Sequence, residues 1–228
     1  MQREFMEKYL TFLTNIPLFN GIFKQDIENL LRGIARVKSF ERQDIILLAG
    51  TPVLEFGIVL EGRVEVARLD PFGRRIIMDI FGPGNLFAEA LACAGTADSP
   101  VTVTAYEPCA VMLINCKMLL SAHKTAAGEH LLSNLLKLIA QKNTLLNNKI
   151  DIVSKPTTRA KIAAYLLWQM KVNGGGRTFK IPLDREGLAD YLSVNRAALS
   201  RELSQMQKES IIGFSKNNFE IKDIRKLA

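Results

Sequence analysis

The stretch SVNRAALSREL, residues 193–203, decides the fold of the C-terminal part of this chain. Asn195 is a residue type that often begins a helix, because its side-chain oxygen accepts hydrogen bonds from the first free backbone N–H groups. Leu199 and Leu203 follow at a spacing of four residues, which places both on one face of a helix. The stretch therefore predicts a helix from about Asn195 to Gln207 with one buried and one exposed face.

A shorter helix is predicted immediately before it, with Asp184 as its N-cap. Ala189 is small enough to let the two helices cross closely, and Ser193 holds a turn position that glycine more often fills. One departure is Glu202, which stands where an apolar residue is frequent. The apolar positions that fit a helix-turn-helix are Leu188, Ala189, Leu192, Val194, Leu199 and Leu203.

The exposed face of the second helix is predicted to read DNA. In a helix-turn-helix, the N-terminal side chains of this helix face the bases of the major groove. An arginine there can form two hydrogen bonds with guanine. Strand-like segments at 211–215 and 219–221 flank an Asn-rich turn and predict a hairpin, the wing of a winged helix. The residues predicted to contact DNA are Asn195, Arg196, Ala197, Ser200, Arg201, Arg185 and Lys216.

The charge distribution supports a polyanionic partner. The chain has a formal net charge of +7, and residues 156–228 hold 13 Lys and Arg against 7 Asp and Glu. Residues 1–125 hold 13 against 14. Positive charge gathered in one small region favours nucleic acid, because binding releases counterions from phosphates. A basic surface that serves only solubility is the alternative.

The first two thirds of the chain predict a different architecture. Its first 35 residues have helical periodicity, and from Val37 short apolar runs alternate with turn signals such as Asp70–Gly73 and Gly82–Gly84. Many short strands with regular turns are typical of an antiparallel barrel or jelly roll. The fold class expected for the chain is α+β, with an N-terminal antiparallel β-roll, a long helix and a C-terminal winged helix-turn-helix.

The long helix carries a heptad pattern with one polar member, Asn143. A single Asn on such a seam weakens packing but fixes the register of a two-stranded pairing. The pattern predicts a homodimer, and an ordinary buried helix is the alternative. The residues predicted to form the dimer interface are Leu132, Leu136, Ile139, Asn143, Leu146 and Ile150.

Pro156 predicts the break after this helix, because the residue before a proline disfavours helical geometry. Thr157 or Thr158 can cap the helix that follows. The predicted domains are an effector-sensing β-roll over 1–127, a dimerisation helix over 128–154 and a DNA-binding domain over 155–228.

Several classes of protein are disfavoured by what the sequence lacks. There is no apolar run of about 18 residues and no signal peptide at the N-terminus, so we expect a cytoplasmic protein with no membrane partner. The three cysteines form neither a disulfide framework nor a metal-binding pair. No Walker loop, GxSxG or HExxH motif is present, so we expect no enzyme.

In this order, the segments resemble the Crp/Fnr family of bacterial regulators over essentially the whole chain. The most specific matches are FGIVLEGRV at 56–64, FGPGNLF at 81–87 and SVNRAALSREL at 193–203. The resemblance implies a homodimer that binds an inverted repeat in double-stranded DNA under the control of an effector in the β-roll. RNA polymerase is a further partner for members that activate transcription.

The residues that bind cyclic nucleotides in this family are replaced. Those members carry Gly-Glu-Leu, whose Glu holds the ribose, and an Arg that neutralises the cyclic phosphate. The resemblance places Asn85 at the position of the ribose-binding Glu and Ser99 at the position of the phosphate-binding Arg. A buried phosphate without its arginine is strongly unfavourable, so we expect no tight binding of cyclic AMP.

We expect instead an unidentified small-molecule effector, with an organic ligand or organic acid preferred, and no cofactor. A mostly apolar pocket with a few polar groups is typical of small-molecule sites. The residues predicted to line this pocket are Gly84, Asn85, Leu86, Phe87, Ser99, Val101 and Asn147.

Metal cofactors of related regulators are disfavoured. An iron–sulfur cluster would need cysteines near the N-terminus, and none precedes Cys93. A haem would need an axial ligand, and His123 and His130 are the only histidines. Cys93 lies in the loop expected over the effector pocket, so both a redox role and burial stay open for it. Cys109 is expected in the core.

The recognition helix also departs from the family, because many members have Glu at the position of Ala197. We expect the operator to differ at the base that this Glu reads. Two alternatives to a ligand-gated regulator stay open at this point. One is a regulatory module that acts by protein contact without binding DNA, and the other is a family member that binds DNA without an effector.

Overall fold

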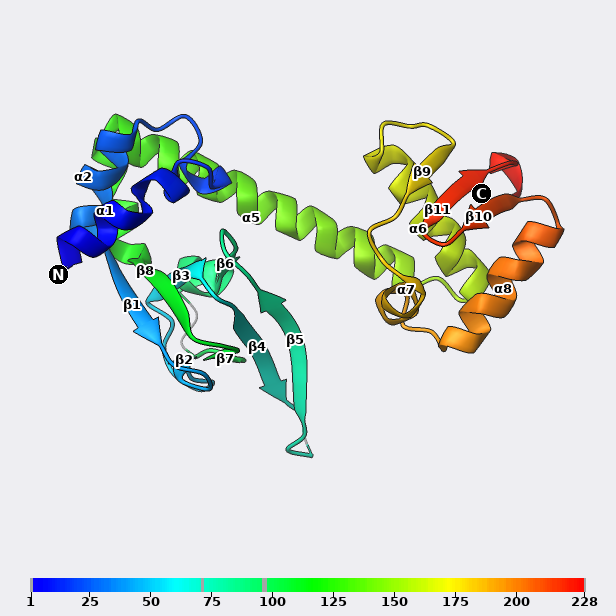
Figure 1. Cartoon of the computed structure of the whole chain (residues 1–228), viewed down its shortest axis with the longest axis horizontal. Helices are drawn as coiled ribbons and strands as arrows, with labels where there is room; N and C mark the ends of the chain where they lie inside the picture. The colour runs from blue at the N-terminus through cyan, green and yellow to red at the C-terminus, as the bar shows by residue number, and fades with distance from the viewer. Residues whose placement is uncertain (1, 71, 96–97, 228) are drawn as a thin grey trace. The chain divides into compact units, whose positions relative to one another are not determined.

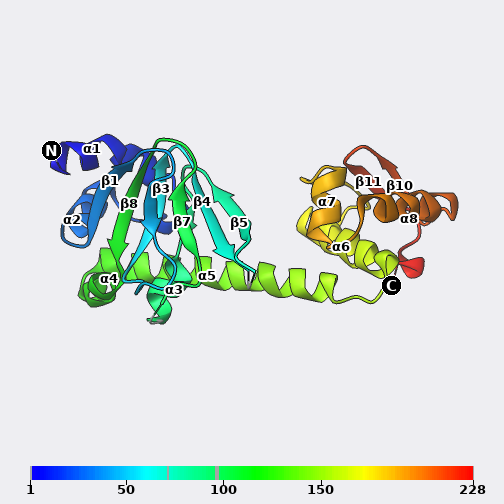
Figure 2. The same ribbon diagram turned by 90° about the horizontal axis from the view of Figure 1, so that it is seen from below.

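The structure is a computed structural model that describes residues 2–70, 72–95 and 98–227. It divides into two compact units, residues 1–141 and 142–228. The division falls inside the long helix, so that helix contributes residues to both units. The α-helices and β-strands of each unit are labelled in Figures 1 and 2.

The N-terminal unit is built on two antiparallel four-stranded sheets, which confirms the predicted β-roll. The first sheet has the order β1-β8-β3-β6, with β1 Ala35–Phe40, β8 Cys109–Asn115, β3 Glu55–Glu61 and β6 Leu86–Phe87. The second has the order β2-β7-β4-β5, with β2 Ile45–Leu47, β7 Thr102–Ala105, β4 Val64–Leu69 and β5 Arg75–Phe81. Pro71, part of one predicted turn, lies outside the described residues.

The first sheet is buried on both faces, because successive side chains of a strand point to opposite sides. Ile58 and Met112 belong to a core on the face that packs against helices. Val59 and Val111 belong to a second core, which the two sheets share. This double burial explains why residues 56–60 form a continuous apolar run instead of an alternating pattern.

Gly57 shows how closely this core is packed. It pairs with Phe87 across β3 and β6. A Cβ added at Gly57 would lie 2.0 Å from the Phe87 ring, so only glycine leaves room for that ring.

Short helices complete the N-terminal unit, and α1 and α2 lie beside β1 (Figure 2). Their bounds are α1 Gln2–Leu13, η1 Pro17–Phe19, α2 Lys24–Ile34, α3 Glu89–Ala94, α4 Cys116–Ser121 and η2 Ala122–Lys124. The long helix α5 follows over Ala126–Val153. It ends before Pro156, and Thr157 caps the next helix by accepting a hydrogen bond from the backbone N–H of Ala160.

The C-terminal unit is a winged helix-turn-helix, as predicted. Its helices are α6 Thr158–Val172, α7 Arg185–Tyr191, α8 Arg196–Lys208 and the short η3 Ile224–Lys226. A three-stranded sheet in the order β10-β11-β9 forms the wing, with β9 Thr178–Lys180, β10 Ile212–Ser215 and β11 Asn218–Ile221. Leu188, Leu199 and Leu203 are fully buried in one core with Phe219 of the wing. Among the described residues, no helix has both the length and the apolar character needed to cross a membrane.

Candidate DNA-binding surface and effector cavity

The two helices of the helix-turn-helix begin at side-chain caps. Asp184 Oδ1 accepts a hydrogen bond from the backbone N–H of Gly187 at 2.8 Å. Asn195 Oδ1 accepts from the N–H groups of Ala197 at 2.8 Å and Ala198 at 3.4 Å. Both predicted N-caps are confirmed, and the second orients the first turn of α8.

The turn between these helices needs a left-handed residue. Ser193 has φ = +51°, a conformation that glycine adopts without strain. The backbone N–H of Ser193 donates to Asp190 O, and that of Val194 donates to Ala189 O. These bonds close the turn despite the serine, so α8 leaves it in a defined direction.

The exposed face of α8 carries two arginines, Arg196 and Arg201. Arg196 and Arg201 are exposed, and within the described part of the chain neither forms an ion pair. Ala197 between them is exposed, and Ser200 is half-buried. Two free guanidinium groups near the start of one capped helix suit contact with phosphates or with guanine.

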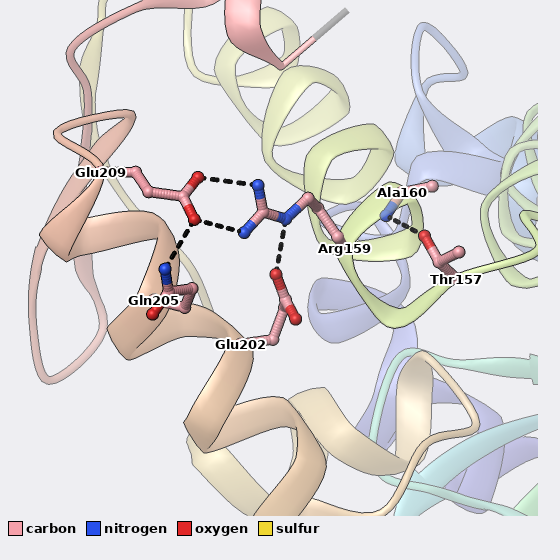
Figure 3. A network of polar contacts seen from close by, with 6 residues as sticks. All are labelled: Thr157, Arg159, Ala160, Glu202, Gln205 and Glu209. Atoms are coloured by element: carbon pink, nitrogen blue, oxygen red, sulfur yellow. Dashed lines mark hydrogen bonds and ion pairs between the residues drawn. The ribbon is translucent and has the colours of Figure 1, made fainter.

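A charged network ties α8 to α6 (Figure 3). Arg159 of α6 donates from Nε to Glu202 at 2.6 Å and from its two terminal nitrogens to Glu209 at 2.7 and 2.9 Å. Gln205 donates to the same Glu209 carboxylate at 2.8 Å. Arg159 and Gln205 lower the pKa of Glu209 from its usual 4.5 to about 2. The network gives Glu202, the departure from the helix-turn-helix pattern, a polar partner, while Leu203 beside it is buried.

Arg185 packs against the wing, a contact that the sequence did not indicate. Its guanidinium carbon lies 4.9 Å from the ring centre of Phe214 and 5.9 Å from that of Phe219. Burial lowers the pKa of Arg185. Such cation–π contacts hold the wing to the start of α7. Lys216, by contrast, is exposed in the two-residue turn of the wing.

The predicted seam of α5 is largely exposed on this chain. Leu136, Leu146 and Ile150 expose 69%, 59% and 60% of their surface. Leu132 and Ile139 are half-buried against the helix-facing core of the N-terminal unit. Large apolar side chains exposed at heptad spacing are typical of a helix that pairs with a second helix.

The structure separates the predicted pocket residues. Leu86 lies in the helix-facing core and Phe87 in the core between the sheets. Ser99 is buried, and its hydroxyl donates to Val101 O at 2.7 Å. Asn147 is exposed on α5, where its amide donates to Asn143 Oδ1 at 3.3 Å.

Two further predicted positions belong to a turn. Gly84 has φ = +85°, and its N–H donates to Val59 O at 2.9 Å. The side chain of Asn85 is exposed and donates to Gly82 O at 3.1 Å. Asn85 therefore stabilises the turn that contains it.

A cavity of about 320 Å³ opens between the two sheets. Phe40, Leu47 and Phe87 form apolar wall, with Ala88 beside them. Lys38 also lines the cavity, and among the described residues no carboxylate is paired with it. Arg36, another lining residue, forms an ion pair with Glu55 at 2.6 Å. The cavity thus combines apolar walls with Lys38, a cation that forms no ion pair among the residues that the structure describes.

A buried carboxylate that directly follows the cavity residue Ala88 was not predicted from the sequence. Glu89 is 5% exposed and begins α3. Ala88 before it has φ = +60°, the left-handed conformation that favours glycine. A left-handed residue followed by a buried glutamate fits the Gly-Glu of cyclic-nucleotide-binding members. The matching residues in the sequence are Ala88-Glu89-Ala90, so Glu89, four residues after Asn85, fits the family glutamate better than Asn85 does.

Among the described residues, no group of three His, Cys, Asp or Glu side chains lies close enough together to hold a metal ion. His130 is exposed, and the side chain of His123 lies outside the described residues.

Comparison with known proteins supports both halves of the structure. Residues 37–125 match the cyclic nucleotide-binding domain, and residues 160–228 match the Crp-like helix-turn-helix domain. A CRP-like cAMP-activated global transcriptional regulator of Mycobacterium tuberculosis is 23% identical over 220 residues, covering 95% of this chain and 96% of that protein. A probable transcriptional regulator, flp, of Lacticaseibacillus casei is 21% identical over 199 residues, covering 86% and 87%.

A solved structure shares the fold. The catabolite activator protein of Thermus thermophilus has a TM-score of 0.55 and 21% identity, covering 92% of this chain and 96% of that one. The two matched domains occur in the order found here, with the helix-turn-helix following the sensor-type domain. The chain is therefore a transcription regulator of the Crp/Fnr family, and not an enzyme, with a cyclic nucleotide-binding-like domain and a DNA-binding helix-turn-helix.

Proposed function

We propose that this regulator binds an inverted repeat in double-stranded DNA as a cytoplasmic homodimer, under the control of a small organic effector. The observation that carries the DNA contact is the pair Arg196 and Arg201, which are exposed on a capped α8 and have no carboxylate partner in the described part of the chain. We propose that Asn195, Ala197, Ser200 and Lys216 also approach the DNA, and that Arg185 acts by holding the wing.

Replacement of Arg201 tests this surface. We expect Arg201→Ala to weaken binding to the specific operator by roughly 5- to 150-fold, the equivalent of about 1–3 kcal/mol for one bidentate base contact. Arg68→Ala is the matched control, because Arg68 is also exposed and unpaired among the described residues but lies on β4. Equal losses in both variants, measured by fluorescence anisotropy at fixed salt, would contradict the proposal.

We also propose that Ala197 lowers the sequence specificity at one base pair. A methyl group cannot accept the hydrogen bond that a glutamate accepts from cytosine, so the regulator should discriminate weakly at that base pair. We expect Ala197→Glu to restore a preference there of roughly 1–3 kcal/mol. Binding to operators randomised at that position measures the preference, and full discrimination by the natural protein would rule the idea out.

The effector proposal rests on the cavity between the sheets. Its volume suits a small organic molecule, and the unpaired Lys38 among apolar walls suits an organic acid. Because Glu89 fits the family glutamate, the case against cyclic AMP rests on Ser99 alone. Its hydroxyl is engaged by Val101 and supplies no positive charge for a phosphate.

Thermal unfolding with a panel of small carboxylates tests this site. We expect a stabilising acid to raise the midpoint of the natural protein and to lose that effect in Lys38→Gln. Lys117→Gln keeps the same charge change on exposed α4 and should retain the effect. Stabilisation by cyclic AMP at micromolar concentration would overturn the proposal.

A further inference from the structure

Two thiols meet in the N-terminal unit. Cys93 lies in α3 and Cys116 is the first residue of α4, and these helices pack against each other. Their Sγ atoms are 3.3 Å apart. A disulfide bond is about 2.05 Å long, so the sulfur atoms need to approach by only roughly 1 Å. Side-chain rotation can supply a movement of that size with the helices in place.

Burial gives the two thiols different access to solvent. Cys116 is 3% exposed, whereas Cys93 is half-buried. Both pack with the helix-facing core. Cys109, the third cysteine, is buried in the other core between the sheets. An oxidant would therefore reach Cys93 first, and Cys116 is the thiol placed to react next.

We propose that Cys93 and Cys116 form a modification site, where a peroxide closes an intramolecular disulfide that ties α3 to α4. The Cys93 thiolate attacks the peroxide, the O–O bond breaks, and one water leaves once the hydroxide takes a proton. Cys116 Sγ then attacks the sulfenic sulfur of Cys93, the S–O bond breaks, and a second water leaves. Two thiols thus give up two electrons and two protons to one peroxide.

The environment sets the speed of this reaction. Burial, with a further contribution from Cys116, raises the pKa of the Cys93 thiol to about 12. The reactive thiolate is therefore scarce at neutral pH, and closure should be slow there and faster as the pH rises. Such a site responds to sustained oxidation and not to a brief exposure.

The bond would restrain a segment next to the effector cavity. α3 begins directly after Phe87 and Ala88, which line that cavity. α4 leads through η2 into α5. An effect of the bond on effector response rests on the proposed function, whereas bond formation itself does not depend on it.

The test uses the full chain, reduced and then treated with hydrogen peroxide. Free thiols are counted with a maleimide, and the linked peptides are identified by mass spectrometry. We expect the count to fall from three to one, with Cys109 left free, and closure to be reversed by dithiothreitol. Amide hydrogen exchange of residues 89–94 should slow in the oxidised protein.

Single cysteine variants distinguish a Cys93–Cys116 disulfide from oxidation elsewhere in the protein. Cys109→Ser should still close the bond, whereas Cys93→Ser should keep its two remaining thiols. Cys116→Ala removes the buried thiol and should likewise keep its two remaining thiols. If Cys116→Ala folds poorly, the result for Cys93→Ser still tests the proposal. Three free thiols after treatment, a linkage between two chains, or sulfonic acid at Cys93 beside a free Cys116 would overturn the proposal. If amide hydrogen exchange of residues 89–94 is unchanged in the disulfide-bonded protein, the bond does not restrain α3. None of these readouts requires DNA or effector.

Discussion

Ser193 accepts a strained backbone at the centre of the helix-turn-helix. A left-handed conformation costs an L-residue roughly 1–2 kcal/mol, and glycine avoids this cost at the expense of a more flexible unfolded chain. We expect Ser193→Gly to raise the free energy of unfolding by about 1 kcal/mol, measured by urea denaturation. Ser193→Ala keeps the strain and should bring no gain. A loss of stability in the glycine variant would show that the serine hydroxyl matters more than the backbone.

Tyr165, in the core of the C-terminal unit, combines a well-packed ring with a buried hydroxyl group. Its hydroxyl is buried and has no hydrogen-bond partner among the described residues, and burial raises its pKa well above the usual value. Its ring makes an edge contact with Tyr191 at 5.2 Å between centres. The ring therefore contributes to packing, while the hydroxyl opposes folding.

We expect Tyr165→Phe to raise the free energy of unfolding by about 1 kcal/mol, because it removes an unsatisfied polar group and keeps the ring. Tyr191→Phe is the control, since Tyr191 is only half-buried and should change stability little. Urea denaturation curves of each single variant of the full chain measure the difference in the free energy of unfolding. A clear loss in Tyr165→Phe would reveal a partner for the hydroxyl.

At the scale of elements, the link between α6 and α8 depends on ionised carboxylates. The folded state lowers the pKa of Glu209, so its contribution to stability is present above about pH 4.5 and is lost as the pH falls toward 2. We expect Glu209→Gln to be less stable than the natural protein at pH 7, with the difference vanishing near pH 2. Thermal unfolding at both pH values measures it.

Glu220→Gln is the control for this prediction, because Glu220 is exposed on β11 and makes no described ion pair. It should change the midpoint little at either pH. A Glu209→Gln effect of equal size at both pH values would mean that the network acts through shape alone.

At the scale of the whole molecule, the exposed seam of α5 predicts a second copy. We expect the natural protein to have twice the chain mass of 25.4 kDa by light scattering, and Leu146→Glu to have the mass of one chain. Charges on a heptad seam would face each other in the pair and lose hydration. The monomeric variant should also lose affinity for an inverted repeat, because it binds one half-site.

Leu145→Glu is the matched control, since Leu145 is a similarly exposed leucine of α5 that lies outside the predicted seam. It should remain a dimer. A dimeric Leu146→Glu protein would place the interface elsewhere.

Local signals explain what could be predicted about the fold. The caps at Asp184 and Asn195, the heptads of α5 and the break before Pro156 each depend on neighbouring residues, and the structure has all of them. β9 was not expected, because its three residues are too few to show a period and its partner β11 lies about forty residues away. The cavity between the sheets could not be predicted in the same way, because its walls come from strands distant in the chain.

By itself, the sequence determined most of the elements and the winged helix-turn-helix, because helical and strand periodicities and capping residues act over a few neighbours. The resemblance to a family of regulators was carried by its motifs at 56–64, 81–87 and 193–203. Only the tertiary structure decided that Glu202 pairs with Arg159, that Arg185 packs on the wing, and that Cys93 meets Cys116. These contacts join residues up to 43 positions apart, and their geometry exists only after the chain has folded.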